Sequence, residues 1–348
     1  MHEWLRELRE TVLDKYGDVL MVGELPGTEA SEVLRYVSAE AREYSCVFDF
    51  DVVSLGGGNA EGIKKYQTST HTLPQFKEAF RKVQHLMRGS DAWVTVFAEN
   101  HDQGRSLSRF ATDDPRFREQ AAKMLAALLA CLTGTLFLYQ GQEIGMYNFP
   151  LPSGKPEDWT IEDIKDIDSL NSYYDVADRF DNDPLWCKKA LAGIQRVGRD
   201  NARTPVQWDD SPNAGFSTAK PWMRVHDDYK NVNVKKQQSD PNSPLSFWKK
   251  MLKLRKQYSD LCVFGDFEIW DKSELDVFTL TKTNEVNGLQ GQKLVVFCSF
   301  SDVEQPMYWP EGCRKGEGAE LLISNLKEGE KVGRYLTPWE ARVYLVKA

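Results

Sequence analysis

The sequence lacks the marks of an exported, disulfide-linked or metal-binding protein. Its six cysteines form no Cys-x-x-Cys pair and no spacing typical of metal ligands, so we expect free thiols and no metal. It contains no Asn-x-Ser/Thr glycosylation site, and residues 1–16 have a charged amphipathic pattern without the apolar core of a signal peptide. We therefore expect a reducing, cytoplasmic location.

Excess positive charge and long hydrophobic runs are also missing. The 348-residue chain has a formal net charge of −8, whereas binding to nucleic acid or an anionic membrane relies on clustered Lys and Arg. The longest apolar stretch, residues 124–139, is interrupted by Thr133 and Gly134 and is shorter than the roughly 20 residues of a membrane-spanning helix. We expect neither a nucleic-acid nor a membrane partner, and a neutral ligand fits better.

Strand and helix patterns alternate through the first 140 residues. Apolar runs predict strands at residues 18–24, 46–53, 93–98 and 135–140. Helical periodicity lies between them, at residues 31–44, 73–88 and 115–132. This alternation predicts an α/β fold with a parallel sheet and right-handed crossovers.

The chain then departs from this alternation. Residues 147–243 are rich in Asp, Asn, Pro and aromatic residues and are too long for a plain connection, so we expect a functional insertion at the ligand face. A predicted helix follows at residues 244–258. Beyond it, a small antiparallel β domain is predicted by short apolar runs near residues 262–270, 276–282, 293–300, 319–324 and 341–346.

Polar residues collect where two of the predicted strands end. Glu24 ends the first strand, and Asn100, His101 and Asp102 follow the third. In α/β folds, ligands bind beyond the carboxyl ends of parallel strands, so these residues are candidates for chemistry. The alternatives are structural: Asp102 could cap the next helix, and Glu24 could be an ion-pair partner at a strand end.

Four motifs stand out along the chain: Val22-Gly23-Glu24, Glu99-Asn100-His101-Asp102, Gly141-Gln142-Glu143-Ile144-Gly145-Met146 and Arg203-Thr204-Pro205-Val206-Gln207-Trp208. In this order and spacing they resemble the α-glucosidases of the α-amylase superfamily, especially the maltase and oligo-1,6-glucosidase group. The resemblance implies a (β/α)8 TIM barrel followed by a C-terminal β-sandwich. It also implies hydrolysis of α-glucosidic bonds with retention of configuration, and no cofactor is expected.

The resemblance also implies roles for four residues. Glu24 matches the family's acid/base, and Asp102 matches the carboxylate that stabilises the oxocarbenium-like transition state. His101 and Arg203 match residues that bind the same glucose, although Arg203 could instead form a salt bridge that pins the insertion. The motif at residues 141–146 is expected to be mainly architectural. The implied substrates are small α-glucosides: maltose, isomaltose, sucrose or short oligosaccharides.

One element of the family pattern has no counterpart. The family's nucleophile is an aspartate in a Gly-Phe-Arg-x-Asp type motif, and four strand-and-helix units are present where a closed barrel needs eight. We therefore expect residues 1–258 to form the second half of a barrel, with the insertion at about 147–243, and residues 259–348 to form the β-sandwich domain. The half sheet would have two open edges and an exposed apolar face. We expect no glucosidase turnover from this chain alone.

Two other classes stay open. One is a catalytically inactive amylase-like module for binding or assembly. The other is a glucosyltransferase or sucrose-isomerase relative, because the acceptor admitted to the site decides the product. The presence of Glu24, His101, Asp102 and Arg203 favours the enzyme lineage. The oligomeric state is not predicted.

Overall fold

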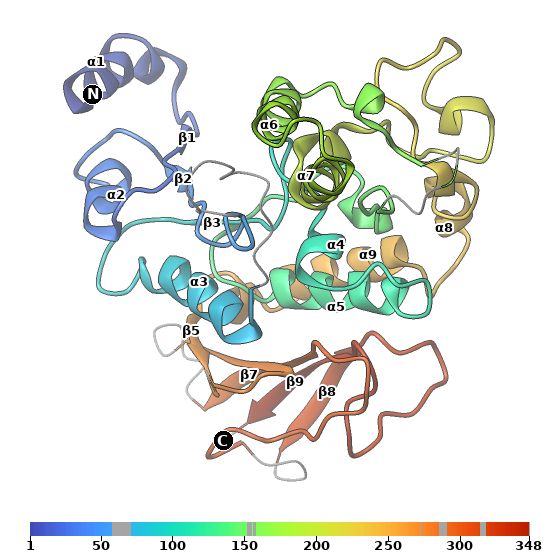
Figure 1. Cartoon of the computed structure of the whole chain (residues 1–348). Helices are drawn as coiled ribbons and strands as arrows, with labels where there is room; N and C mark the ends of the chain where they lie inside the picture. Colours follow the sequence, from blue (N-terminus) through green and yellow to red (C-terminus); the bar gives the residue numbers. More distant parts are fainter. Residues whose placement is uncertain are drawn as a thin grey trace.

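The computed structural model describes residues 1–57, 71–151, 155, 158–271, 273–284, 291–313 and 318–347. Figure 1 shows the first strands and helices on the left and the helical insertion at the upper right. A β-sheet lies along the bottom, beneath helices α3 (Leu73–His85) and α5 (Arg118–Ala130).

Four short parallel strands lie side by side in the order of the chain. Strand β1 (Val22–Glu24) pairs with β2 (Cys46–Phe48), and β3 (Thr95–Val96) pairs with β4 (Thr135–Leu136). A parallel bridge between Val47 and Val94 joins the two pairs. This arrangement confirms the predicted parallel sheet.

The strands are shorter than their apolar runs. Strand β2 stops at Phe48, because Asp49 Oδ1 then accepts the backbone N–H of Asp51 at 2.8 Å and turns the chain. The apolar residues beyond this turn, Val52 and Val53, are buried without being part of a strand. The runs therefore mark buried chain more reliably than strand ends.

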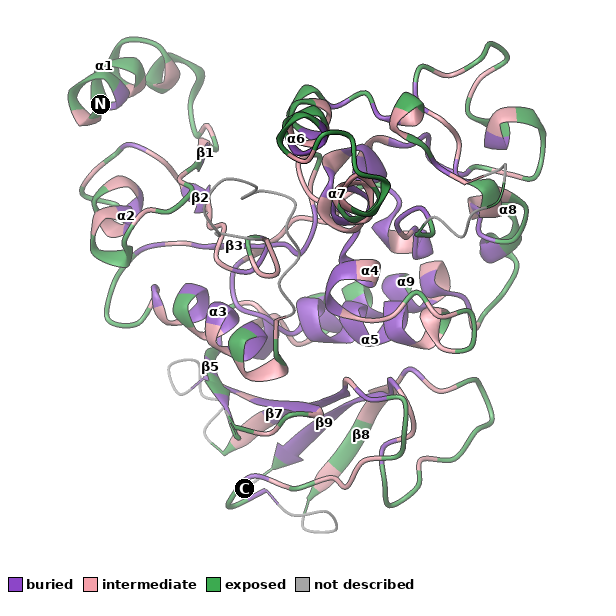
Figure 2. Ribbon diagram, in the orientation of Figure 1, coloured by how far each residue is buried: buried purple, intermediate pink, exposed green. Residues whose placement is uncertain are grey.

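Helices cover the parallel strands. Helices α1 (His2–Thr11) and α3 lie where helical patterns were found, and α3 begins with a capping box between Thr72 and Gln75. Helix α2 (Ala30–Val37) is shorter than the predicted helix at residues 31–44, because the backbone becomes extended at Ser38. Helix α5 begins at Arg118 instead of Pro115, because the N–H of Phe117 bonds to the carbonyl of Asp114 and forms a separate turn. Figure 2 shows α5 almost wholly buried, packed beside α9 (Pro244–Gln257).

The insertion has a helical core of its own. Helices α6 (Ile167–Arg179) and α7 (Pro184–Val197) are capped by Asp166 and Asp183, and α6 was not expected from the sequence. The short helices are α4 (Ser106–Phe110), which precedes the insertion, and α8 (Val234–Gln238) within it. A separate hydrophobic cluster lies within this region and contains Phe149, Trp159, Ile164, Ile194 and Met223.

The C-terminal strands form one antiparallel sheet in the order β5-β6-β7-β9-β8. The strands are β5 (Asp266–Ile269), β6 (Val277–Thr283), β7 (Gln292–Ser299), β8 (Ala319–Ser324) and β9 (Ala341–Lys347). The first predicted run instead begins in helix α10 (Ser259–Cys262).

The expected sandwich of two sheets is not what the described residues form. One face of the sheet joins the core around α5, through residues such as Phe278, Leu294 and Val343. The other face is covered by irregular segments that carry Met307, Trp309, Cys313 and Leu336. A single antiparallel bridge, between Gln305 and Leu336, joins two of these segments, and the described residues form no second sheet there. Because the main core crosses residue 258, the division into two domains there stays a prediction.

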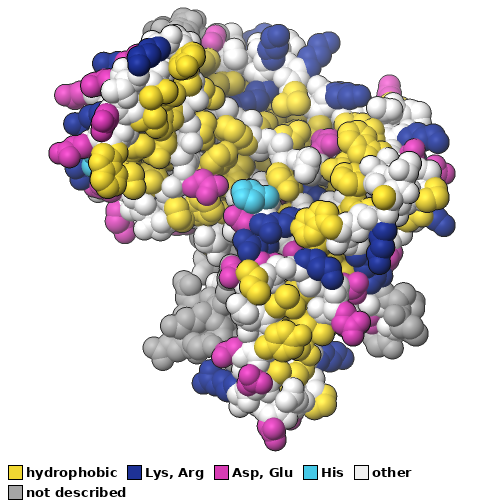
Figure 3. Space-filling model, turned by 90° about the horizontal axis from the view of Figure 1, so that it is seen from above, with side chains coloured by type: hydrophobic (Ala, Val, Ile, Leu, Met, Phe, Trp, Pro, Cys, Tyr) yellow, Lys and Arg dark blue, Asp and Glu magenta, His cyan; other side chains and the backbone are white. Residues whose placement is uncertain are grey.

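Both outer strands of the parallel sheet have an open edge. Within the described residues, β1 pairs with β2 alone and β4 with β3 alone. Leu5 is the one buried side chain of α1, whereas Trp4 of the same helix is 70 % exposed. Figure 3 shows hydrophobic side chains gathered over broad areas of the face seen from above. The expected open edges and exposed apolar surface are thus present.

Among the described residues, no helix is long and apolar enough to cross a membrane. All six cysteines are free thiols, and five of them are buried. This confirms the expectation of unpaired cysteines. The cytoplasmic location stays a prediction.

Candidate active site

The candidate carboxylates lie at the carboxyl ends of strands in the parallel sheet. Glu24 is the last residue of β1 and pairs with Phe48 of β2, and its side chain is exposed. Gly23 beside it cannot be replaced without strain, because an added Cβ would lie 2.7 Å from Cζ of Tyr44. His101 and Asp102 follow β3, two strands away. No hydrogen bond or ion pair among the described residues links Glu24 to Asp102.

A buried ion pair holds the loop after β3. Arg105 Nη1 lies 3.2 Å from Glu99 Oε1, and the two side chains are 0 % and 1 % exposed. The other oxygen of Glu99 accepts the N–H of Ser106 at 2.6 Å, and Arg105 also donates to the carbonyls of Gln140 and Asn201. Arg105 therefore joins the ends of β3 and β4 to the insertion.

Asp102 sits at the tip of this loop with its carboxylate partly exposed. Its backbone N–H donates to Asn100 Oδ1 at 2.9 Å, which fixes the turn. Its Oδ2 lies 3.3 Å from Nε2 of His101. The alternative role of Asp102 as a helix cap is wrong, because α4 begins at Ser106 and Glu99 accepts its first N–H.

Arg203 reaches the two candidate residues that follow β3, His101 and Asp102. Its Nε donates to the carbonyl of His101 at 2.8 Å, and its Nη2 lies 2.8 Å from Asp102 Oδ1. The salt bridge proposed as the structural alternative is therefore present, and its partner is Asp102. One contact both pins the insertion and places a cation beside the candidate site.

The sequence reasoning missed Arg199. It lies with Arg203 in the 3₁₀ helix η4 (Arg199–Arg203), and its Nη1 is 3.2 Å from the same oxygen of Asp102. Its Nη2 lies 2.5 Å from Asp166 Oδ1. The spacing of the two arginines by four residues was the available signal, but nothing local to residue 199 indicates a partner at residue 102.

The motif at residues 141–146 forms a tight turn beyond β4, and its architectural role stays a prediction. Gly141 has a φ of +90°, and a Cβ there would lie 2.5 Å from Met146 Sδ. Its N–H donates to Glu143 Oε2 at 2.7 Å. Burial raises the pKa of Glu143.

Comparison with known proteins identifies the family of this chain. Residues 1–263 match the alpha-amylase catalytic domain. The chain belongs to the alpha-amylase family. It is 40 % identical over 350 residues to an alpha-glucosidase of Candida albicans, and 38 % identical over 350 residues to an oligo-1,6-glucosidase of Parageobacillus thermoglucosidasius. These alignments cover 99 % and 100 % of this chain, but 58 % of each relative.

Similar solved structures show the same coverage. The crystal structure of Bacillus licheniformis trehalose-6-phosphate hydrolase has a TM-score of 0.86 and 30 % identity, covering 100 % of this chain and 59 % of that one. A mutant of the trehalulose synthase MutB also has a TM-score of 0.86 and 30 % identity, covering 99 % and 59 %. The chain therefore spans somewhat more than half the length of these relatives.

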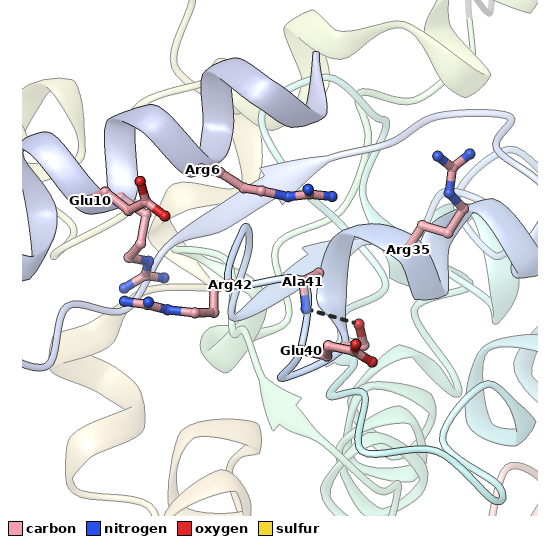
Figure 4. Close-up of a pocket in the computed structure, with 8 residues that line it drawn as sticks. Arg6, Glu10, Arg35, Glu40, Ala41 and Arg42 are labelled. Carbon is pink, nitrogen blue, oxygen red and sulfur yellow. Dashed lines mark hydrogen bonds between the residues drawn. The ribbon is translucent and has the colours of Figure 1, made fainter.

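A pocket elsewhere on this alpha-amylase family member is rich in arginine but is not the candidate site. It has a volume of about 390 Å³ and lies between α1 and α2, as Figure 4 shows. Three of its four arginines are in ion pairs, Arg6 with Glu43, Arg35 with Glu32 and Arg42 with Asp14. The fourth, Arg9, donates to the backbone carbonyls of Val19 and Glu43. Elsewhere in the described part of the chain, no cluster of three or more His, Cys, Asp or Glu side chains could hold a metal ion.

Proposed function

We propose that this chain supplies the acid/base and the sugar-binding residues of a retaining α-glucosidase site. Glu24 is the acid/base, Asp102 stabilises the transition state, and His101 and Arg203 bind the glucose ring. The contact of Arg203 with both His101 and Asp102 carries the proposal, because it assembles three of the four residues at the carboxyl edge of the sheet. Membership of the alpha-amylase family supports it.

The geometry suits the chemistry of glycoside cleavage. Glu24 is exposed at the strand end, where its carboxyl group can protonate the leaving glycosidic oxygen and later remove a proton from water. As the glycosidic bond breaks, positive charge develops on the sugar ring, and the carboxylate of Asp102 stabilises it. Oδ2 of Asp102 lies beside His101, so these two groups can bind neighbouring hydroxyls.

A retaining reaction also needs a nucleophilic carboxylate roughly 5 Å from the acid/base. The sequence has no counterpart of the family's nucleophile, so we propose that this chain alone does not hydrolyse glucosides. The substrates we propose are small α-glucosides such as maltose, isomaltose, sucrose and short oligosaccharides, in line with the names of the relatives. A glucosyl-transferring enzyme is the second candidate, because the trehalulose synthase structure matches as well as the hydrolase.

Isothermal titration calorimetry of the purified chain with isomaltose, maltose and sucrose tests the proposal. We expect saturable binding that Asp102→Asn weakens about ten-fold, the effect of a lost hydrogen bond to a charged group. Asp210→Asn is the matched control, because Asp210 is 65 % exposed and pairs with Lys235 at 3.5 Å, outside the cluster around Asp102. We expect it to bind as the wild type does.

Three results would count against the proposal. Absence of binding to every α-glucoside would refute sugar recognition. Equal binding by the wild type and Asp102→Asn would favour an inactive binding module that uses another surface. Release of glucose from maltose or isomaltose by the pure chain would refute the part of the proposal that concerns the missing nucleophile.

A further inference from the structure

Two arginines, not one, hold the candidate carboxylate. Arg203 Nη2 lies 2.8 Å and Arg199 Nη1 3.2 Å from Oδ1 of Asp102. Both cations therefore share one oxygen. The other oxygen, Oδ2, lies 3.3 Å from Nε2 of His101 and has a further lone pair that can accept a hydrogen bond from a ligand.

Arg199 is anchored on its far side. Its Nε and Nη2 both reach Asp166 Oδ1 at 2.5 Å, and the side chain of Asp166 is 0 % exposed. Asp166 is itself fixed, because its oxygens accept the N–H groups of Asp168 and Ser169 at the start of α6. Arg199 is thus held at the Asp166 end and reaches Asp102 with its other terminal nitrogen.

The backbone strengthens this anchor. Asp200, the residue after Arg199, accepts the N–H groups of Lys165 and Asp166 with Oδ2, at 2.7 and 3.0 Å. The segments around residues 166 and 200 are therefore clamped together from both sides. Arg199 cannot shift relative to Asp166 without breaking these bonds.

We propose that Arg199 is a positioning residue that orients Asp102 for sugar binding by tying its Oδ1 to the insertion. This inference rests on the proposed function. Arg199 acts through Asp102, and Arg203 binds the ring. An arginine is needed because a guanidinium can donate to two carboxylates at once, whereas an ammonium is a compact point charge.

The charges around Arg199 agree with this role. Burial lowers the pKa of Arg199, but the hydrogen bonds and charges of Asp166 and Asp102 outweigh it, and the net effect is a raised pKa. Asp168 adds a third carboxylate at 3.8 Å. Arg199 therefore stays charged while bridging the three acidic groups.

Calorimetric titration of the full chain with isomaltose tests the inference. Arg199→Ala should raise the Kd about ten-fold, since it removes one charge-assisted hydrogen bond from Asp102. Arg199→Lys should fall between the wild type and Arg199→Ala. Asp166→Asn should raise the Kd by less than Arg199→Ala does, because asparagine still caps α6 but holds Arg199 more weakly.

The matched control is Arg224→Ala. Arg224 is 24 % exposed, like Arg199, lies in the same insertion and pairs with Asp163 and Asp227, away from Asp102. Its replacement should lower the thermal midpoint about as much as Arg199→Ala but leave the Kd within about two-fold, because additivity holds for distant sites.

A double-mutant cycle separates positioning from general destabilisation. In an Asp102→Asn background, Arg199→Ala should change the Kd by less than about two-fold, because the group through which it acts has lost its charge. If its full effect persists there, or if it binds isomaltose as Arg224→Ala does, the inference is refuted while the proposed function stands. If the wild type binds no sugar, the proposed function fails and this inference falls with it.

Discussion

Replacement of Arg105 by methionine is the sharpest test of how the loop after β3 is held. Methionine keeps roughly the apolar stem of the arginine side chain but removes the guanidinium group, with its charge and all its donors. Glu99, which is 1 % exposed, would then keep the N–H of Ser106 but lose its cation. Breaking a buried ion pair from one side costs about 3–5 kcal/mol, because an uncompensated charge stays buried.

The backbone contacts of Arg105 add to this cost. The hydrogen bond to the carbonyl of Gln140 is short, at 2.7 Å, and its loss adds about 1 kcal/mol. The bond to Asn201, at 3.3 Å, is longer and contributes less. We therefore expect Arg105→Met to lower the free energy of unfolding by about 4–6 kcal/mol.

Urea unfolding followed by circular dichroism measures this loss. The double variant Glu99→Gln with Arg105→Met should recover at least half of it, because no charge is then left unpaired. Arg116→Met is the surface control: Arg116 is 71 % exposed in its pair with Asp114, and we expect a change below about 0.5 kcal/mol. A loss under about 1 kcal/mol for Arg105→Met, or no recovery in the double variant, would refute the reasoning.

Two further predictions concern packing and pH. Gly23→Ala should lower the free energy of unfolding by about 1–3 kcal/mol, because its Cβ would lie 2.7 Å from the ring of Tyr44. In a Tyr44→Leu background, urea unfolding should show a smaller loss for Gly23→Ala, and an equal loss would contradict the steric explanation. Burial lowers the pKa of Lys282 from 10.5 to about 7. Between pH 7 and pH 10.5, Lys282 is therefore protonated in the unfolded state but neutral in the folded state, so the free energy of unfolding rises with pH. Lys282→Met should flatten this rise in urea titrations at several pH values, and an unchanged slope would exclude Lys282 as its source.

Much of the fold could be predicted because its signals are local. Buried runs and helical periodicity located the four parallel strands and the helices over them, including α3 and α9. The errors arose where a side chain or a turn ended an element, as Asp49 does after β2. The expected sandwich failed for another reason: β7 and β9 are buried on both faces, but irregular segments without periodicity cover the second face.

The candidate site likewise contains residues that the sequence could predict and residues that it could not. Glu24, His101, Asp102 and Arg203 could be singled out because they stand in short motifs. Arg199 and Arg105 were missed as working parts of the site because their contacts depend on the folded chain: Arg199 and Asp102 are 97 residues apart, and Arg105 and Asn201 are 96 residues apart. Ion pairs across such separations leave no periodic pattern, and a coordinate structure is needed to find them.

In the site that we propose, the insertion supplies groups that the loop after β3 lacks. The loop after β3 by itself offers one carboxylate and one imidazole, both partly exposed to water, where a sugar hydroxyl must compete with solvent. Helix η4 of the insertion adds Arg199 and Arg203, which occupy one oxygen of Asp102 and leave the other oriented toward His101. A carboxylate fixed in this way loses less rotamer freedom when a ligand binds, so the sugar recognition that we propose would depend on the insertion as much as on the sheet.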